Sequence, residues 1–147
     1  MLPINPWEHQ NAVKSLYSKC VGTVCIKHQI TRMELDILLF LANNPRFDTA
    51  ADMVEIRYLS KSQVSVSVKE LEGHGYIRKE YENRNRKTAH LKVCKKAEEI
   101  IRDGQGAQEK FLQIMLKGFS REEIGIMRKY NERILENLNT YLKEDME

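Results

Sequence analysis

The stretch SKSQVSVSVKELEGHGYI, residues 60–77, decides the fold because its pattern fits two different structures. Residues 64–68 alternate apolar and polar side chains, which is the pattern of a half-buried strand. Ser60 and Gln63, however, have the spacing of a capping box, in which two side chains satisfy the free backbone N–H groups of a helix start. A helix start therefore stands directly before the apparent strand.

The apolar positions of the same stretch choose between the two structures. At about 100° per residue, Val64, Val68 and Leu71 share one side of a helix. The opposite side then carries Ser62, Ser65, Val66 and Lys69. In a strand, Leu71 would instead join the serine face. We therefore predict a helix over about residues 61–73, which ends where Gly73 or Gly75 tolerates a positive φ.

Helical spacing, capping boxes and β-prone segments predict the elements around this helix. The expected elements are a helix over residues 7–28, a helix from the Thr31–Glu34 capping box to Asn43, a short helix from Thr49 to about Tyr58, a hairpin of strands 76–81 and 88–93, a long helix from Lys95 to Gly118 and a last helix opened by Ser120 and Glu123. Gly104 and Gly106 are expected to kink the long helix.

Composition limits the class of protein. The chain has 147 residues, of which 41% are hydrophobic and 31% charged, as in a helix-rich soluble domain. Its longest apolar run, residues 37–42, is too short to cross a bilayer, and the N-terminus lacks a signal-peptide pattern, so a cytoplasmic location without membrane contact is expected. The three cysteines are too widely spaced for a zinc site, and no cofactor or metal is predicted.

Positive charge is concentrated beside the predicted helix. The whole chain has a net charge of +3, whereas residues 78–96 contain eight basic and two acidic residues. Such a basic segment is either a solvated surface or the footprint of a polyanionic partner.

A short helix, a turn, a second helix and a two-stranded hairpin form the order of a winged helix-turn-helix. In this motif the second helix enters the DNA major groove, and the loop between the strands contacts the backbone or the minor groove. Small, hydroxyl and amide side chains suit the helix, and basic ones suit the wing, here residues 82–88. The predicted DNA-contacting residues are Ser60, Lys61, Ser62, Gln63, Ser65, Val66, Lys69, Arg84, Asn85, Arg86 and Lys87.

Several motifs in this order resemble one family. Thr31–Leu38 resembles its second-helix opening, and Leu59–Ile77 resembles its recognition helix with the exit Leu71-Glu72-x-x-Gly75-Tyr76-Ile77. The wing signature Asp-x-Arg-Asp is matched by Glu82-Asn-Arg-Asn85, which keeps the arginine, and the next motif has Cys94 for Thr and Ala97 for Gly. The chain thus resembles the MarR-family winged helix transcriptional regulators over nearly its whole length.

The resemblance implies a mainly α fold with a small β-hairpin wing, and N- and C-terminal helices that form a homodimer on a palindromic operator. The expected regions are an N-terminal dimerisation helix in 1–30, a winged helix-turn-helix in 31–95 and C-terminal dimerisation helices in 96–147. The last helix has an apolar stripe over five turns, which calls for a partner surface, either a second chain or its own. The predicted interface residues are Trp7, Val13, Met127, Ile134, Leu138 and Tyr141.

Two kinds of regulation remain open from the sequence. Cys20 or Cys25 would sense oxidants if a lowered pKa favoured the thiolate, the alternative being buried structural thiols. The resemblance also implies a crevice for a small aromatic effector. Its candidate lining residues are Leu16, Met33, Phe40 and Phe111, which by their spacing are equally ordinary core residues.

The leading hypothesis is a dimeric, sequence-specific DNA-binding regulator, most often a repressor in this family. The sequence has no phosphate-binding loop, no metal-ligand spacing and no nucleophile with a placed base, so an enzyme is not predicted. An alternative from another class is a winged-helix scaffold that binds proteins but not DNA. DNA binding at low salt distinguishes the two.

Overall fold

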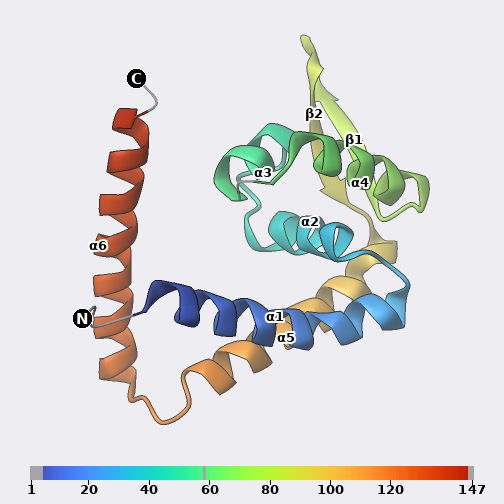
Figure 1. The fold of residues 1–147 in the computed structure, drawn as a ribbon. Coiled ribbons are helices and arrows are strands. Elements are labelled where there is room, and N and C mark those ends of the chain that lie inside the picture. Colours follow the sequence, from blue (N-terminus) through green and yellow to red (C-terminus); the bar gives the residue numbers. More distant parts are fainter. Residues whose placement is uncertain (1–4, 58, 146–147) are drawn as a thin grey trace. The chain divides into compact units, whose positions relative to one another are not determined.

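The computed structural model describes residues 5–57 and 59–145 and has the predicted mainly α fold with a β-hairpin (Figure 1). The elements are α1 (Pro6–His28), α2 (Arg32–Asn43), α3 (Ala50–Arg57), α4 (Lys61–Gly73), β1 (Ile77–Glu82), β2 (Asn85–Val93), the 3-10 turn η1 (Lys95–Ala97), α5 (Glu98–Met115) and α6 (Arg121–Asp145). The chain divides into two compact units, Met1–Phe111 and Leu112–Glu147. Tyr58, the predicted end of the third helix, lies outside the described residues.

Two capping boxes define the starts of α2 and α3. The Glu34 N–H donates to Thr31 Oγ1 over 3.1 Å, and Glu34 Oε1 accepts from the Thr31 N–H over 3.0 Å. Thr49 and Asp52 make the same reciprocal pair at 3.1 and 3.2 Å. Both boxes satisfy N–H groups that a helix start leaves without an intrahelical acceptor. The predicted helix starts are thus confirmed.

The core of the first unit is built around α2. This helix is buried on nearly all sides, and Leu35, Ile37 and Leu38 have no exposed surface. The other elements contribute one apolar face each, from α1 to α5. The buried hydrophobic residues outside α2 are Val21, Val24, Met53, Val64, Val68, Leu71, Ile77, Leu91, Ala97, Ile100 and Ile101.

Gly104 lies where α5 passes close to α2. A Cβ atom at this position would stand 2.8 Å from Leu39 Cδ2 and 3.2 Å from Leu35 Cδ1, closer than packed carbon atoms approach. Around it α5 is one continuous helix from Glu98 to Met115. Glycine is therefore needed here for close packing rather than for the kink that the sequence suggested.

The turn of the hairpin is shorter, and its strands longer, than the sequence predicted. β1 and β2 are antiparallel, with Ile77 opposite Val93 and Glu80 opposite His90. The strands continue to Glu82 and Asn85, so only residues 83 and 84 form the turn. The predicted loop over residues 82–87 is wrong, because pairing extends into polar residues that carry no β-prone signal.

Helix α6 presents apolar residues without burying them. The Ser120 and Glu123 capping box begins it, with hydrogen bonds of 2.9 and 3.1 Å. The Ser120 backbone N–H, which donates to the Glu123 carboxylate, and then the Ser120 hydroxyl hold the pKa of Glu123 below its ordinary value. No residue of α6 with a described side chain is buried within the chain. Leu138 and Tyr141 are 56% and 64% exposed.

A separate property concerns membranes. Among the described residues, no helix is both long and apolar enough to span a bilayer.

Candidate nucleic-acid interface

Helix α4 has the two faces that its sequence predicted. Val64, Val68 and Leu71 are buried against the core. All the residues predicted to face DNA from this helix and its cap are exposed: Ser60, Lys61, Ser62, Gln63, Ser65, Val66 and Lys69. Val66 is a large apolar side chain left 63% exposed, which suits contact with a partner better than contact with water.

The start of α4 uses some of the hydroxyl groups that the sequence assigned to DNA. The Gln63 N–H donates to Ser60 Oγ over 3.5 Å, so Ser60 is the N-cap. Its hydroxyl also lies 3.0 Å from Ser62 Oγ. In the described part of the chain, the Gln63 side chain makes no return bond to Ser60, so only half of the predicted capping box forms. The Gln63 amide stays available on the surface.

Ser67 was missed by the sequence reasoning. It is 9% exposed and belongs to the buried side of α4. A helical wheel places it about 60° from Val64, so the spacing contained the signal. Only the serines at 62 and 65 belong to the exposed face.

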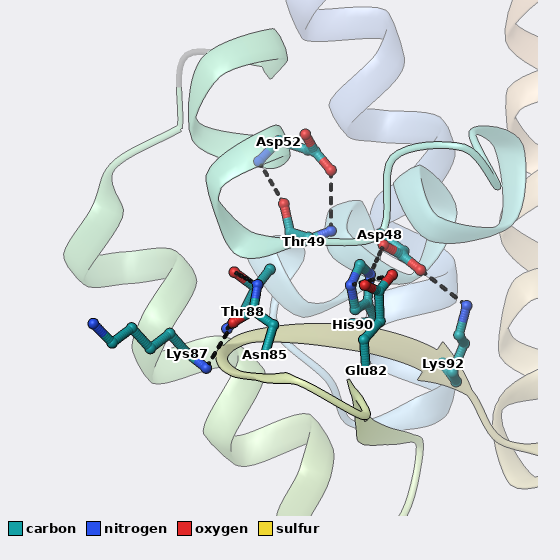
Figure 2. A network of polar contacts seen from close by, with 9 residues as sticks. All are labelled: Asp48, Thr49, Asp52, Glu82, Asn85, Lys87, Thr88, His90 and Lys92. Carbon is teal, nitrogen blue, oxygen red and sulfur yellow. Dashed lines mark hydrogen bonds and ion pairs between the residues drawn. The ribbon is translucent and has the colours of Figure 1, made fainter.

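The wing tip is shaped by Asn85. Its Oδ1 accepts hydrogen bonds from the N–H groups of Lys87 and Thr88 over 3.0 and 3.2 Å (Figure 2). Such a bond from a side chain to the following backbone stabilises a turn. Asn85 is also predicted to contact DNA, and in the structure its carboxamide oxygen is engaged within the wing.

Three cations at the wing tip have no ionic partner. Arg84, Arg86 and Lys87 are exposed, and no ion pair among the described residues includes any of them. Figure 2 shows the Lys87 side chain extended away from the hairpin. Their charge is therefore free to attract a polyanion.

The wing base is the end of the hairpin next to the helices, and several of its cations have partners within the chain. Arg78 lies 2.9 Å from Glu80, and Lys79 lies 3.9 Å from Glu72. Lys96 donates to the carbonyl oxygen of His74 over 2.7 Å. The charges of Arg78 and Lys79 are thus offset by carboxylates, whereas Lys96 is held by a neutral acceptor.

Asp48, in the loop before α3, is the centre of the base (Figure 2). Its two carboxylate oxygens lie 2.7 Å from His90 Nδ1 and 2.9 Å from Lys92 Nζ. Partial burial opposes ionisation of Asp48, but the hydrogen bonds from Lys92 and His90 outweigh it, so the pKa of Asp48 lies below its ordinary value. The sequence reasoning missed this network, because its members are 42 and 44 residues apart.

A crevice of about 430 Å³ opens among helices α1, α2 and α5, the end of α3 and Leu59. Its lining residues are Lys14, Tyr17, Arg32, Asp36, Leu39, Phe40, Asn43, Arg57, Leu59 and Gln108. Of the four residues proposed from sequence to line an effector crevice, Phe40 does so. Leu16, Met33 and Phe111 do not line it.

The crevice holds a carboxylate between cations. Asp36 Oδ1 accepts from Arg32 Nε over 2.9 Å, and Arg57 also acts on Asp36 by charge. Burial raises the pKa of Asp36, and the arginines oppose the shift without cancelling it. A desolvated acid in a crevice with aromatic walls is typical of a ligand site.

The cysteines of α1 are free and half-buried. Burial raises the pKa of Cys25, and this effect exceeds the opposing charge of Arg32. A raised pKa lowers the fraction of reactive thiolate, so the structure disfavours Cys25 as an oxidant sensor. Cys94 is the third free thiol and precedes η1 without a side-chain cap bond.

One group of potential metal ligands comes together where α1 meets α5. Ligand atoms of His28, Glu99 and Asp103 all lie within 4.8 Å of one another. Lys27 Nζ, however, lies 2.8 Å from Asp103 Oδ2, the same oxygen that His28 Nε2 contacts at 2.7 Å. The group is therefore an ion-pair network between the two helices, in which hydrogen bonds from Lys27 and His28 hold the pKa of Asp103 below its ordinary value.

The predicted dimer-interface residues remain available in the single chain. Trp7 is 70% exposed, and Val13 and Met127 are half-buried. Ile134 is 52% exposed, and Leu138 and Tyr141 are exposed to a similar extent.

Comparisons with known proteins match part of the chain to one family and nearly all of it to one fold. Residues 28–87 match the model of the MarR family. No curated protein matches the chain in sequence. The structure is similar to that of the MarR protein from Peptoclostridium difficile, with a TM-score of 0.79 and 15% identity over 97% of this chain and 94% of that one.

Two similar structures contain DNA. A Listeria monocytogenes protein complexed with 26-mer DNA has a TM-score of 0.78 and 18% identity, over 93% of this chain and 90% of that one. The S. aureus MepR–DNA complex has a TM-score of 0.74 and 14% identity, over 92% and 96%. At these identities the likeness establishes the winged-helix fold.

Proposed function

We propose that the chain, of which residues 28–87 match the model of the MarR family, is a sequence-specific DNA-binding transcriptional regulator. Members of this family are regulators of transcription and not enzymes. The observation that carries the proposal is the exposed polar face of α4 beside three unpaired cations on the wing tip. In this arrangement α4 enters the major groove, and Arg84 reaches the minor groove, whose negative potential attracts arginine.

Fluorescence anisotropy with random duplex DNA at about 50 and 200 mM salt tests the proposal. A chain that neutralises several phosphates binds at the lower salt and loses orders of magnitude of affinity at the higher one. Selection from a random duplex library then yields the operator. A chain that binds no duplex at either salt concentration would instead be the winged-helix scaffold.

We further propose that the protein acts as a homodimer, which explains the surface of α6. Seven large apolar side chains of this helix are each 50–64% exposed: Ile126, Tyr130, Ile134, Leu135, Leu138, Tyr141 and Leu142. A monomer rarely exposes so long an apolar stripe, and a symmetric partner would bury it. Two wings and two recognition helices would then bind the two halves of a palindromic operator as a repressor.

Sedimentation equilibrium tests the dimer. Leu138→Glu is expected to produce a monomer whose affinity for the operator is strongly reduced. The matched variant Glu136→Gln, which removes an exposed charge from the same helix, should stay dimeric. A monomeric wild type at micromolar concentration would remove the dimer from the proposal.

The crevice supports a second element, response to a small aromatic molecule. The guanidinium of Arg32 lies 4.8 Å from the Tyr17 ring centre, and that of Arg57 lies 5.7 Å from the Phe40 ring centre. Such a site offers aromatic walls and cations to an amphipathic aromatic anion. Titration of the DNA complex with benzoate is expected to release DNA, and Arg57→Met should abolish the response. Release that persists unchanged in Arg57→Met would locate the effect elsewhere.

A further inference from the structure

Asp48 is joined to three consecutive residues of β2. Its carboxylate contacts His90 at 2.7 Å and Lys92 at 2.9 Å. Its backbone oxygen accepts the N–H of Leu91 over 2.7 Å. One residue outside the hairpin therefore fixes this part of the strand through side-chain and backbone bonds at once.

The position of Asp48 in the chain links the wing to the helices. Asp48 directly precedes Thr49, whose hydroxyl begins the capping box of α3. Helix α3 packs on α4. The bonds of Asp48 thus join the base of the wing to the start of the helix-turn-helix, so the wing cannot tilt without breaking them.

Small tilts at this base become large displacements at the tip. Four residues separate His90 from Arg86, which corresponds to about 14 Å along an antiparallel strand. A rotation of about 10° at the base would move the tip by about 2 Å, enough to lose a hydrogen bond to a phosphate or a base. Among the described residues, no ion pair holds the side chains of Arg84, Arg86 and Lys87 against the helices.

His90 lies between two carboxylates but is hydrogen-bonded to one of them. Its Nδ1 lies 2.7 Å from Asp48 Oδ1, whereas its Nε2 lies 3.7 Å from Glu82 Oε1, which is too long for a hydrogen bond. Glu80 lies opposite His90 in the strand register, while Lys92 and Arg78 are the nearby cations. Asp48 is therefore the acid that holds His90 in place.

We propose that Asp48 is the positioning residue of the wing, and that its bonds to His90 and Lys92 set where the tip cations meet DNA. This inference rests on the proposed DNA-binding function and adds a residue that does not itself touch DNA. Its removal leaves the tip cations in place but lets them move relative to α4.

A double-mutant cycle tests the inference. Arg84→Ala is expected to weaken operator binding about tenfold in the wild-type background and less than about twofold in Asp48→Asn, because a displaced wing has little contact to lose. Glu72→Gln removes another ion pair to the hairpin, and in that background the Arg84 effect should stay about tenfold. An equal Arg84 effect in the Asp48→Asn and wild-type backgrounds would overturn the inference.

Lys92→Met provides an independent readout if Asp48→Asn does not fold, because it removes one of the two side-chain contacts of Asp48 from the strand side. In this background the Arg84→Ala effect is expected to fall from about tenfold to about threefold. An Arg84 effect that stays about tenfold in Lys92→Met would overturn the inference. A wild type that binds no DNA overturns the proposed function and this inference with it.

Discussion

The base and the tip of the wing both carry basic side chains, but they differ in whether those side chains have partners within the chain. Four basic side chains at the base have partners within the chain: Arg78, Lys79, Lys92 and Lys96. Three at the tip have none among the described residues: Arg84, Arg86 and Lys87. Paired cations stabilise the hairpin, whereas unpaired ones are available to another molecule. The net charge of the segment does not tell stabilising cations from available ones, whereas the distances to neighbouring groups do.

Helix α4 also exposes a face that is available to another molecule, and a substitution there has the largest expected effect on operator affinity. Ser65 is exposed on the face that lacks partners. A carboxylate at this position would lie against phosphates, and such like-charge contacts cost several kcal/mol, so Ser65→Glu should weaken operator binding by at least about 100-fold. Ser65→Ala removes the hydroxyl without adding charge and should cost less than about tenfold. Anisotropy titrations measure both, and full affinity in Ser65→Glu would mean that another face binds DNA.

A matched pair of arginines tests the wing directly. Arg84→Ala at the tip should weaken binding about tenfold and reduce the salt slope by about one counterion. Arg78→Ala at the base removes an equal charge that Glu80 already neutralises, so its salt slope should remain close to that of the wild type. Titrations over a range of salt concentrations give the slopes. Equal slopes for the two variants would contradict the division of the wing into two regions.

The smallest expected effect concerns stability in acid. The hydrogen bonds of Asp48 depress its pKa relative to the unfolded chain, so their contribution is present above about pH 4 and is lost as pH falls through the folded-state pKa. Between pH 6 and 3, the wild type should therefore lose about 2 °C more in Tm than Asp48→Asn. Thermal unfolding followed by circular dichroism measures this difference. Parallel curves would show that Asp48 adds no stability through ionisation.

The features that the sequence predicted depend on neighbours within one turn or one strand. Capping boxes at Thr31, Thr49 and Ser120 join residues three apart, and helical spacing separates the two sides of α4. These local rules are sufficient for the order of elements and for the exposed residues of the candidate site. The cap at Ser60 and the helical spacing therefore predicted α4 correctly despite the strand-like alternation in residues 64–68.

The features that the sequence did not predict depend on distant contacts. The partners of Asp48 are more than 40 residues away, and no local pattern connects them. The role of Gly104 is visible only once α5 lies against α2. The hydrogen bonds from two backbone N–H groups to Asn85 Oδ1 give this residue a role in the turn besides its predicted DNA contact.

Leu39 connects two parts of the first unit that are otherwise described separately. It lines the crevice, and its methyl carbons are the atoms that leave no room for a side chain at Gly104. Because Leu39 is 2% exposed and closely packed, a molecule that displaces it from the crevice must also press on α5. Leu39 thus connects the crevice to the backbone of α5 through direct packing contacts.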